Sequence, residues 1–368
     1  MATDQLTVAF LRRGYSSSGG AETYLQRLAQ GVCAAGHRAQ LVTTEDWPAA
    51  AWPFGPITFV RGKTPPRFAD EVEQLRPKLA CDVLMSLERI WRCDVFRAGD
   101  GVHAAWLQRR AQFGGGLQNL RVALNPKHQA ILRLEETIFS QGGAGRVIAN
   151  SRMVKQEITD FYGYPADRIE HVPNGVPAAL FRPSAEKRAA SRAAFGLSSS
   201  EIAVLFAGSG WERKGLRFAI DAVDWCANSH LRLLVAGRGS QANYPSQAAQ
   251  FLGVVSDLPM LFAAADIFIL PTIYDPFSNA CLEAVAAGVP VITTRCNGFS
   301  EVVDNGIHGS VIEDPANIEA LGSALRLWSD ERRREEARPK LLDLAARFDI
   351  SINVARTLEI LLQARAGG

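Results

Sequence analysis

Short apolar runs alternate along the chain with longer segments whose apolar positions recur at helical spacing. The first run, Thr7–Leu11, is followed by a segment rich in serine and glycine and then by an amphipathic stretch that reaches Val32 and closes at Gly36. A short run rich in apolar and β-branched residues predicts a strand, and spacings of three and four residues predict a helix. The chain therefore begins with a predicted strand, glycine loop and helix.

The same order of elements restarts in the second half of the chain at Ile202. Strands that alternate with helices predict a parallel, doubly wound sheet, so the repeat predicts two Rossmann-like α/β domains. The predicted strands are Thr7–Leu11, Ala39–Thr43, Ile57–Val60 and Asp82–Ser86 in the first half, and Ile202–Ala207, Leu231–Ala236, Ile267–Leu270 and Val289–Thr293 in the second.

A turn-forming segment, Pro173–Pro177, separates the two halves, and we expect the interdomain hinge there. A chain of 368 residues is too long for one ordinary core and suits two α/β domains. We expect domains over residues 1–173 and 174–349, facing each other across a cleft. A last helix, at about 350–368, is expected to pack back on the first domain.

The composition excludes several classes of protein. Hydrophobic residues make up 47% and charged residues 21%, as in soluble globular proteins. The net charge is only +2, which gives no reason to expect nucleic acid as a partner. No signal peptide or membrane-spanning run is present in the sequence, and the six cysteines form no CxxC pair. We therefore expect a cytoplasmic protein.

The segment 274–292 carries the most informative motif. Asp275 ends a strand-to-helix loop, and Glu283 follows eight residues later in the predicted helix. Phe277, Ser278 and Asn279 are expected to present free amide N–H groups at the helix N-terminus, where partial positive charge favours a phosphate. Glu283 would then accept hydrogen bonds from ribose hydroxyls. The alternative for either acid alone is a loop cap or a solvated helix residue.

A second motif, Gly208–Gly215, follows a predicted strand and opens a helix. Arg213 offers a planar fork to phosphate oxygens and Lys214 a mobile point charge, so the pair could stabilise charge on a leaving nucleotide. The alternative is a solvated surface pair. We expect the Lys214→Ala variant to lose on the order of 10²-fold or more in turnover without unfolding.

No Asp-x-Asp sequence and no metal-spaced group of His or Cys residues occurs in the chain. The diphosphate of a nucleotide would then have to be neutralised by Arg213, Lys214 and helix N-termini. We expect a divalent metal to be dispensable, and we expect no cofactor.

These motifs together resemble those of glycosyltransferase family 4, whose members have the GT-B fold and retain the anomeric configuration of the transferred sugar. The acidic pair resembles the family's E-x7-E signature, with the departure that its first acid is Asp275. The resemblance implies that Asp275 lies beside the donor sugar, that Glu283 binds the ribose, and that Arg213 and Lys214 bind the diphosphate. It also places the donor in the second domain and the acceptor in the first.

The resemblance extends to less specific positions. Gly19 and Gly20 match the family's glycine loop after the first strand, and Gly208 begins the corresponding glycine loop of the second domain. Asp100 or His103 falls where the family has an acceptor-side loop and could orient or deprotonate the acceptor hydroxyl. Arg238, in a loop on the donor side, could help to hold the nucleotide.

Within the family, three segments resemble the lipopolysaccharide core glucosyltransferases that modify the first heptose. They are Asp94–Asp100, Leu132–Phe139 and the Arg-Lys-Gly loop. The resemblance implies transfer of a hexose, glucose in those proteins, from a UDP-linked sugar to a hydroxyl of a glycolipid or saccharide acceptor, the lipopolysaccharide inner core. UDP-glucose is therefore the expected donor.

Basic residues are interleaved with aromatic and aliphatic ones between residues 97 and 133. Two interpretations stay open: a face that contacts an anionic membrane or a phosphorylated lipid acceptor, and a solvated helical face. The residues concerned are Arg97, Arg109, Arg110, Arg121, Lys127, His128 and Arg133, with Trp106, Leu107, Phe113 and Leu120 between them.

Parts of the sequence also match functions other than glycosyl transfer. The segment Gly237–Ala242 matches the G-x-G-x-x-A pattern of nicotinamide enzymes, but the residues before the next apolar run are too few for a helical crossover and include Pro245. Two alternatives remain: a nucleotide-sugar epimerase of the same fold and a noncatalytic glycolipid-binding module. Release of free nucleotide only when acceptor is present would separate transfer from both.

Overall fold

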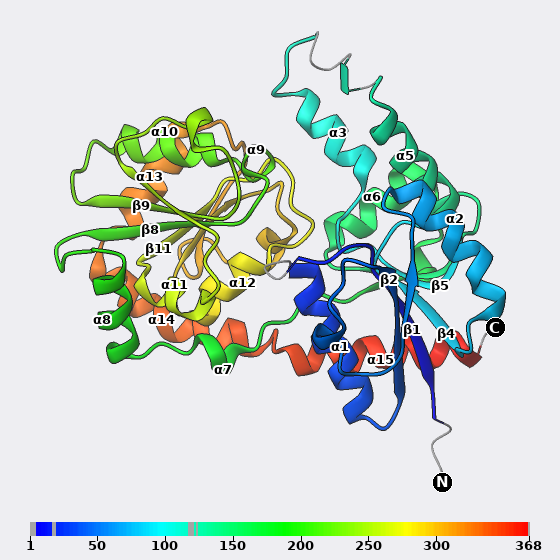
Figure 1. Cartoon of the computed structure of the whole chain (residues 1–368). Coiled ribbons are helices and arrows are strands. Elements are labelled where there is room, and N and C mark those ends of the chain that lie inside the picture. Colours follow the sequence, from blue (N-terminus) through cyan, green and yellow to red (C-terminus); the bar gives the residue numbers. More distant parts are fainter. Residues whose placement is uncertain (1–4, 17–19, 117–120, 123, 367–368) are drawn as a thin grey trace. The chain divides into compact units, whose positions relative to one another are not determined.

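The computed structural model describes residues 5–16, 20–116, 121–122 and 124–366 (Figure 1). The chain divides into two compact units. The first unit comprises Met1–Pro173 together with Ser351–Gly368, and the second comprises Asn174–Ile350. Each unit is built around its own parallel sheet with helices on both faces.

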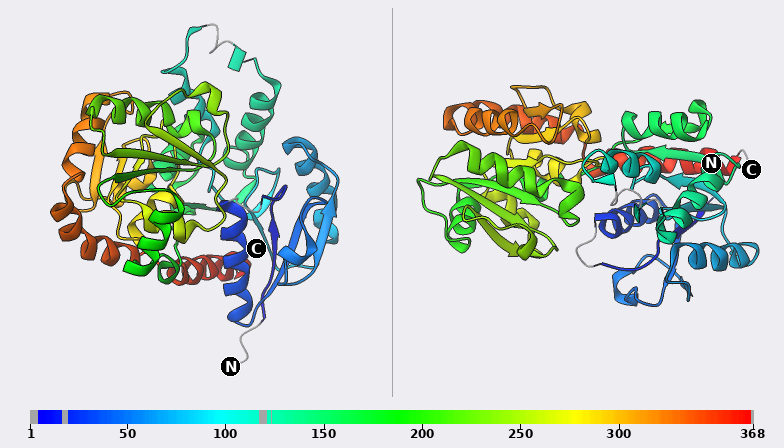
Figure 2. Two further views of the ribbon diagram at one scale, coloured as in Figure 1. Left: turned by 60° about the vertical axis from the view of Figure 1, so that its left-hand side comes forward. Right: turned by 90° about the horizontal axis from the view of Figure 1, so that it is seen from above.

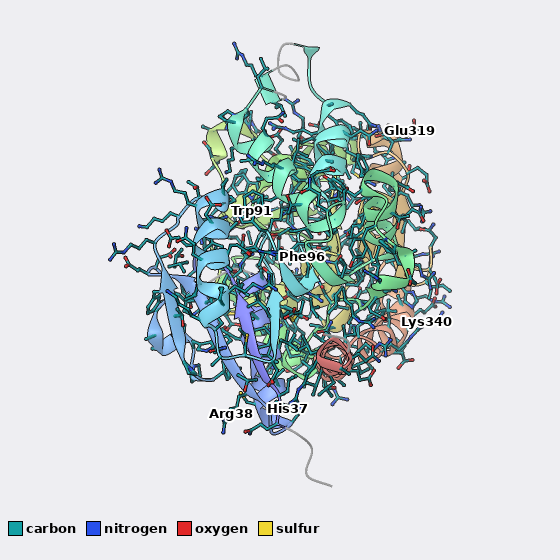
Figure 3. All side chains as sticks on the ribbon, turned by 90° about the vertical axis from the view of Figure 1, so that its right-hand side faces the viewer. His37, Arg38, Trp91, Phe96, Glu319 and Lys340 are labelled. Atoms are coloured by element: carbon teal, nitrogen blue, oxygen red, sulfur yellow. The ribbon has the colours of Figure 1, made fainter. Side chains whose placement is uncertain are left out.

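The first unit contains a parallel sheet in the order β3-β2-β1-β4-β5-β6-β7. In Figure 3, His37 and Arg38 mark the amino ends of the strands, and Phe96 marks the opposite end of β5. The strands are β1 Thr7–Leu11, β2 Arg38–Thr44, β3 Ile57–Val60, β4 Val83–Ser86, β5 Cys93–Arg97, β6 Ala144–Ala149 and β7 Ile169–His171.

The α-helices that cover this sheet include the last helix of the chain. Helix α15 packs against α1 (Figures 1 and 2), and a Cβ on Gly31 of α1 would lie only 2.2 Å from Cγ1 of Val354. Glycine at this position therefore allows the two helices to approach closely. The helices are α1 Gly20–Ala34, α2 Pro65–Leu75, α3 His103–Ala111, α5 Pro126–Phe139, α6 Arg152–Tyr162 and α15 Ile350–Ala366.

The second unit contains a parallel sheet in the order β10-β9-β8-β11-β12-β13. Helices α10 and α13 cover one face, and α11, α12 and α14 cover the other (Figure 1). The strands are β8 Ile202–Ala207, β9 Leu231–Ala236, β10 Ala249–Gly253, β11 Ile267–Leu270, β12 Val291–Thr294 and β13 Gly309–Ile312. The helices are α7 Ala178–Phe181, α8 Ala185–Ala194, α9 Trp211–Lys214, α10 Leu216–Cys226, α11 Leu258–Ala264, α12 Asn279–Ala286, α13 Ile318–Trp328 and α14 Glu331–Ala346.

Both sheets have the doubly wound strand order, which reverses direction beside the first strand. The reversal lies between β1 and β4 in the first unit and between β8 and β11 in the second. In such sheets, ligands bind outside the carboxyl ends of the strands at this switch point. The fold class predicted from the sequence, two parallel Rossmann-like domains, is confirmed, and the loops that leave these four strands are where a functional site is expected.

The eight predicted strands are all present, with ends that differ by at most two residues. Strands β5, β6, β7, β10 and β13 were not predicted. Polar residues interrupt the apolar pattern of β5 and β6, because Asp94 and Arg97 lie in β5 and Arg146 lies in β6. Arg97 is nevertheless buried, and its guanidinium lies 4.0 Å from the centre of the Tyr24 ring. The connection from β9 to β10 contains a 3-10 turn and no α-helix, as the short spacing predicts.

Candidate active site

An ion pair joins two loops at the switch point of the second unit. Lys214, from the loop after β8, places its Nζ 3.0 Å from Oδ2 of Asp275, in the loop after β11. The Lys214 and Asp275 side chains are only 13% and 7% exposed. Arg213 Nη1 donates a hydrogen bond of 2.9 Å to the carbonyl oxygen of Tyr274. The structure therefore brings three of the predicted residues, Arg213, Lys214 and Asp275, to one place.

Glycines make this approach of the two loops possible. Gly215 has a φ of +75°, and a Cβ there would lie 1.9 Å from the carbonyl oxygen of Pro271. Gly208 has a φ of +141°, and a Cβ there would lie 2.7 Å from Cδ of Lys214. Side chains at these two positions would clash and would have to adopt a backbone conformation that favours glycine. The packing therefore favours glycine at positions 208 and 215 of this loop.

The charge of Asp275 is set by opposing effects. Burial alone would raise the pKa of its carboxyl group, but Lys214 and, to a lesser degree, Arg213 and the Phe277 amide hold that pKa below its usual value. The carboxylate is ionised at neutral pH as a consequence. Removing Lys214 would leave a buried charge without its main partner, which typically costs about 3–5 kcal/mol. We therefore expect Lys214→Ala to lower the stability of the protein as well as its turnover, and that the variant stays folded is still a prediction.

Helix α12 begins at Asn279, one residue after the start that the sequence predicts. The expected free amide groups on both preceding residues are not present. The Ser278 N–H donates to Oδ1 of Asn297 at 3.3 Å, and the Phe277 N–H donates to Asp275. The prediction of free donors at Phe277 and Ser278 is therefore wrong. The first turn of the helix, which Asn279 opens, keeps amide groups that point out of the helix N-terminus.

The remaining side chains of this motif have different surroundings. Phe277 is buried against Phe299 and Phe348 and belongs to the core. Asn279 accepts a hydrogen bond of 2.6 Å from Nδ2 of Asn174. Glu283 is half-buried in the second turn of α12.

Asn297 supports the loop after β11 and was not identified from the sequence. It is fully buried, and its Oδ1 accepts from the amides of Ser278 and Phe299. Its Nδ2 donates to the Thr293 hydroxyl at 3.0 Å. Asn297 therefore ties the loop after β12 to the start of α12. Its place in the short polar segment that follows the predicted strand Val289–Thr293 is the signal that could have identified it.

The loop after β9 lies beside the glycine loop. The exposed Arg238 donates its amide N–H to the Ser209 hydroxyl at 3.2 Å, and a Cβ on Gly237 would lie 2.2 Å from the Gly208 carbonyl oxygen. A hollow of about 740 Å³ adjoins this loop. It is lined by Gln241, Ala242, Tyr244, Pro245, Ser246 and Gln247.

A different network occupies the switch point of the first unit. Arg12, directly after β1, places its Nη1 2.8 Å from Oε1 of Glu88, which follows β4, and its Nη2 3.1 Å from Oε1 of Glu22. Asp100 lies 3.8 Å from the same guanidinium, and its side chain is 60% exposed. Burial raises the pKa of Glu88, although Arg12 lowers it in part. Asp100 is the carboxylate of this network that faces solvent.

His103 is the first residue of α3, and its side chain has a different partner from that of Asp100. Its Nε2 is 2.9 Å from Nδ1 of His128, and burial lowers its pKa to about 4, with Arg89 contributing in the same direction. The ring is therefore neutral at pH 7. Gly20 is the first residue of α1, and Gly19 lies outside the described residues.

Among the residues that the structure describes, no group of three or more His, Cys, Asp or Glu side chains is arranged to hold a metal ion. No described helix combines the length and the apolar character that crossing a bilayer requires.

These observations define a class: a protein of two parallel α/β units, one of which presents cations from a glycine loop at its switch point. Comparison with known families gives the same result more specifically. Residues 18–180 match the model described as Glycosyltransferase Family 4, and residues 201–330 match the model described as Glycosyl transferases group 1. The chain belongs to the family 4 glycosyltransferases with the GT-B fold.

Individual relatives are distant. An uncharacterized glycosyltransferase of Methanocaldococcus jannaschii is 29% identical over 205 residues, which is 52% of this chain and 52% of that protein. The chain thus spans about half the length of this relative.

Two solved structures have a similar fold over nearly their whole length. WaaG, a glycosyltransferase involved in lipopolysaccharide biosynthesis, superposes with a TM-score of 0.82 at 21% identity, covering 96% of this chain and 99% of that one. HepE of Anabaena, solved with UDP-glucose, superposes with a TM-score of 0.72 at 21% identity, covering 96% and 100%. At this level of identity the likeness establishes the fold.

Proposed function

We propose that the protein is a retaining, metal-independent glycosyltransferase that moves a hexose from a nucleotide sugar to a hydroxyl of a glycolipid or saccharide acceptor. The observation that carries the proposal is the convergence of Arg213, Lys214 and Asp275 at the switch point of the second unit. In a chain of this family, cations at that position suit the diphosphate of a donor. The second unit, residues 174–349, is then the donor domain, and residues 1–173 with the last helix form the acceptor domain.

The donor would be held by complementary charge without a metal ion. Lys214 and Arg213 would neutralise the diphosphate as the bond to the sugar breaks, and the amides at the start of α12 would add partial positive charge. Glu283 would accept hydrogen bonds from the ribose. Asp275 already accepts a hydrogen bond from Lys214 and so holds this lysine in place. The resemblance to the family implies that Asp275 would also lie beside the donor sugar.

Resemblance to known glycosyltransferases supports a choice of donor and acceptor. UDP-glucose is the donor we favour, and its presence in the HepE structure supports this choice. The lipopolysaccharide inner core is the acceptor we favour, and the involvement of WaaG in lipopolysaccharide biosynthesis supports it. Asp100 would orient or deprotonate the acceptor hydroxyl, because its carboxylate is exposed at the switch point of the first unit.

Contact with an anionic membrane surface would give the enzyme access to a lipid-linked acceptor. In the α3–α5 region, the Arg110 guanidinium lies 5.8 Å from the centre of the Trp106 ring. Phe113 and Leu124 are 40% and 72% exposed. Basic groups beside exposed apolar side chains favour the interface of an anionic leaflet. Flotation with vesicles that contain anionic lipid, compared with neutral vesicles, tests this contact.

The decisive experiment measures nucleotide release. The protein is incubated with UDP-glucose, with and without lipopolysaccharide core acceptor, and free UDP is quantified. Glycosyl transfer predicts UDP release that requires the acceptor, and it predicts no change when a chelator is added. Interconversion of UDP-glucose without net UDP release would instead favour the epimerase alternative. Acceptor binding without any turnover would favour the binding module.

A further inference from the structure

A buried carboxylate in the first unit holds the loop that carries Asp100 and His103. Glu135, on α5, is 0% exposed and accepts four hydrogen bonds. Two come from backbone amides at the start of α3, those of His103 at 2.7 Å and Ala104 at 3.3 Å. The other two come from Arg89 Nε and from the Tyr162 hydroxyl, both at 2.8 Å. A fully buried carboxylate therefore binds the first backbone amides of α3.

Arg89 holds the same loop from its other side. Its Nη2 donates to the carbonyl oxygen of Gly101 at 2.7 Å, while its Nε pairs with Glu135. Arg89 and Glu135 thus bond to the backbone both before and after Val102. Gly101 has a φ of +68°, and its N–H donates to the Ala98 carbonyl oxygen at 3.1 Å. This closes a turn in which Gly99 and Asp100 are exposed, and Asp100 carries its only charged side chain.

Stability of the core alone does not explain why the ion pair of Glu135 and Arg89 is buried. Charged pairs pay a large desolvation cost on burial, and apolar residues of similar size often stabilise a core better. Glu135 and Arg89 bind backbone atoms of the loop. They therefore fix the conformation of the loop and leave its side chains available for other contacts. A carboxylate at a helix N-terminus also interacts favourably with the helix dipole.

We propose that Glu135 and Arg89 act as positioning residues for the acceptor. They fix the backbone of the segment Gly99–Ala104, here called the acceptor loop, so that Asp100 is presented to the acceptor hydroxyl in one orientation. This inference rests on the proposed function for the role of Asp100. It concerns acceptor alignment only, because Glu135 and Arg89 belong to the first unit and Lys214 belongs to the second.

The first test separates acceptor from donor effects. Glu135→Gln keeps the size of the side chain but turns an NH₂ group toward donors, so the acceptor loop loses part of its anchorage. We expect kcat/KM for the acceptor to fall on the order of 10²-fold, the loss typical of a misplaced reacting group. The Kd for UDP, measured by calorimetry, should stay within about twofold. Equal losses in donor affinity and acceptor kinetics would overturn the inference, because a general structural defect would explain both.

Two further variants control this test. Glu136→Gln removes the adjacent, exposed carboxylate of the same helix and should leave acceptor kinetics unchanged. Tyr162→Phe removes one of the four bonds to Glu135 but keeps its charge, so we expect a smaller loss, about tenfold. If Glu135→Gln does not fold, Tyr162→Phe takes its place in the comparison. Wild-type acceptor kinetics in a folded Glu135→Gln protein would contradict the inference.

Hydrogen exchange tests the positioning without any need for activity. Amide protection of His103 and Ala104 is measured in the full-length protein and in the Glu135→Gln and Glu136→Gln variants. We expect faster exchange in the acceptor loop of Glu135→Gln alone. Unchanged exchange there would overturn the inference even if activity falls. If the wild-type protein transfers no sugar, the proposed function has failed, and the exchange result still decides whether Glu135 fixes the loop.

Discussion

The switch points of the two units are built in different ways. In the second unit, one buried ion pair, Lys214 with Asp275, connects two loops, and each partner lies within a continuous motif. In the first unit, Arg12 is shared by Glu22, Glu88 and the exposed Asp100, which lie far apart in the sequence. Under the proposed function, the compact and enclosed ion pair suits the diphosphate of a donor. The network around Arg12 instead keeps one carboxylate open to solvent, which suits the proposed contact with an acceptor hydroxyl.

The largest effect should come from breaking the ion pair of the second unit. Lys214→Ala removes the cation proposed to stabilise the leaving diphosphate, so we expect turnover with UDP-glucose to fall on the order of 10²-fold or more. It also leaves Asp275 buried without its main partner, and thermal melting should show a loss of stability. Lys187→Ala, which changes an exposed lysine of the same unit, should alter neither quantity.

A double variant separates the two consequences. Lys214→Met with Asp275→Asn removes both charges, so the melting temperature should recover most of the loss seen in Lys214→Ala. Turnover should not recover, because the cation is still absent. Recovery of turnover together with stability would mean that Lys214 acts only on folding, and the donor site would have to be assigned elsewhere.

A second prediction concerns the approach of the two loops in the same site. Gly215 and Gly210 both have a φ of +75°, but only at Gly215 would a Cβ clash, with the Pro271 carbonyl oxygen at 1.9 Å. Both alanine variants should pay the cost of a left-handed backbone, about 1–2 kcal/mol. Gly215→Ala should lose more stability in denaturant unfolding and should bind UDP more weakly. Equal losses in the two variants would show that the clash is relieved by a movement of the loop.

The contrast between the units also explains what the sequence could predict. The start of α12 and the meeting of Arg213, Lys214 and Asp275 could be inferred from local motifs, because strand ends and helix starts bring such residues to the same edge of a sheet. Local motifs could not predict that the amides of Phe277 and Ser278 are already hydrogen-bonded within the protein. The Ser278 amide donates to Asn297, which follows 19 residues later and makes this contact only in the folded chain. The Phe277 amide donates to Asp275 of the same motif, a contact that depends on the conformation of the loop.

The supporting residues of the first unit were missed for a related reason. Glu135 falls in the apolar stripe of α5, since Ile131, Leu134, Ile138 and Phe139 have the spacing of one helix face. A carboxylate in such a stripe signals burial with a partner. The stripe does not identify that partner, because Arg89 lies 46 residues away. Long-range pairs of this kind require the fold before they can be named.

A third prediction sharpens the comparison on the acceptor side. Asp100→Asn keeps the shape of the side chain and removes its charge. If Asp100 deprotonates the acceptor hydroxyl, acceptor-dependent turnover should fall about 10²-fold, which is within the range of general acid–base effects. If Asp100 only orients the hydroxyl, the loss should be smaller. Stability should hardly change, because an exposed ion pair contributes about 0–1 kcal/mol. UDP affinity should also be unchanged. A drop in UDP affinity would place Asp100 on the donor side and remove the proposed division between the units.

The smallest effect should be the pH dependence of stability contributed by His103. Its pKa in the folded protein is about 4, because burial and Arg89 disfavour the charged ring, whereas an unfolded histidine has a pKa of about 6.5. Between these values the unfolded chain binds a proton that the folded chain does not. Stability should therefore fall as the pH drops from about 6.5 to about 4, and should be fully present above that window.

The measurement is the melting temperature of the wild-type protein and of His103→Gln between pH 7 and pH 4.5. The variant should lose less stability than the wild type over this range, because glutamine does not titrate. His128, whose pKa is lowered by burial, contributes in the same direction and should leave part of the dependence in place. His230→Gln, which changes an exposed histidine of the second unit, should follow the wild type. Parallel curves for His103→Gln and wild type would mean that the His103 ring gains a proton as readily in the folded chain as in the unfolded one.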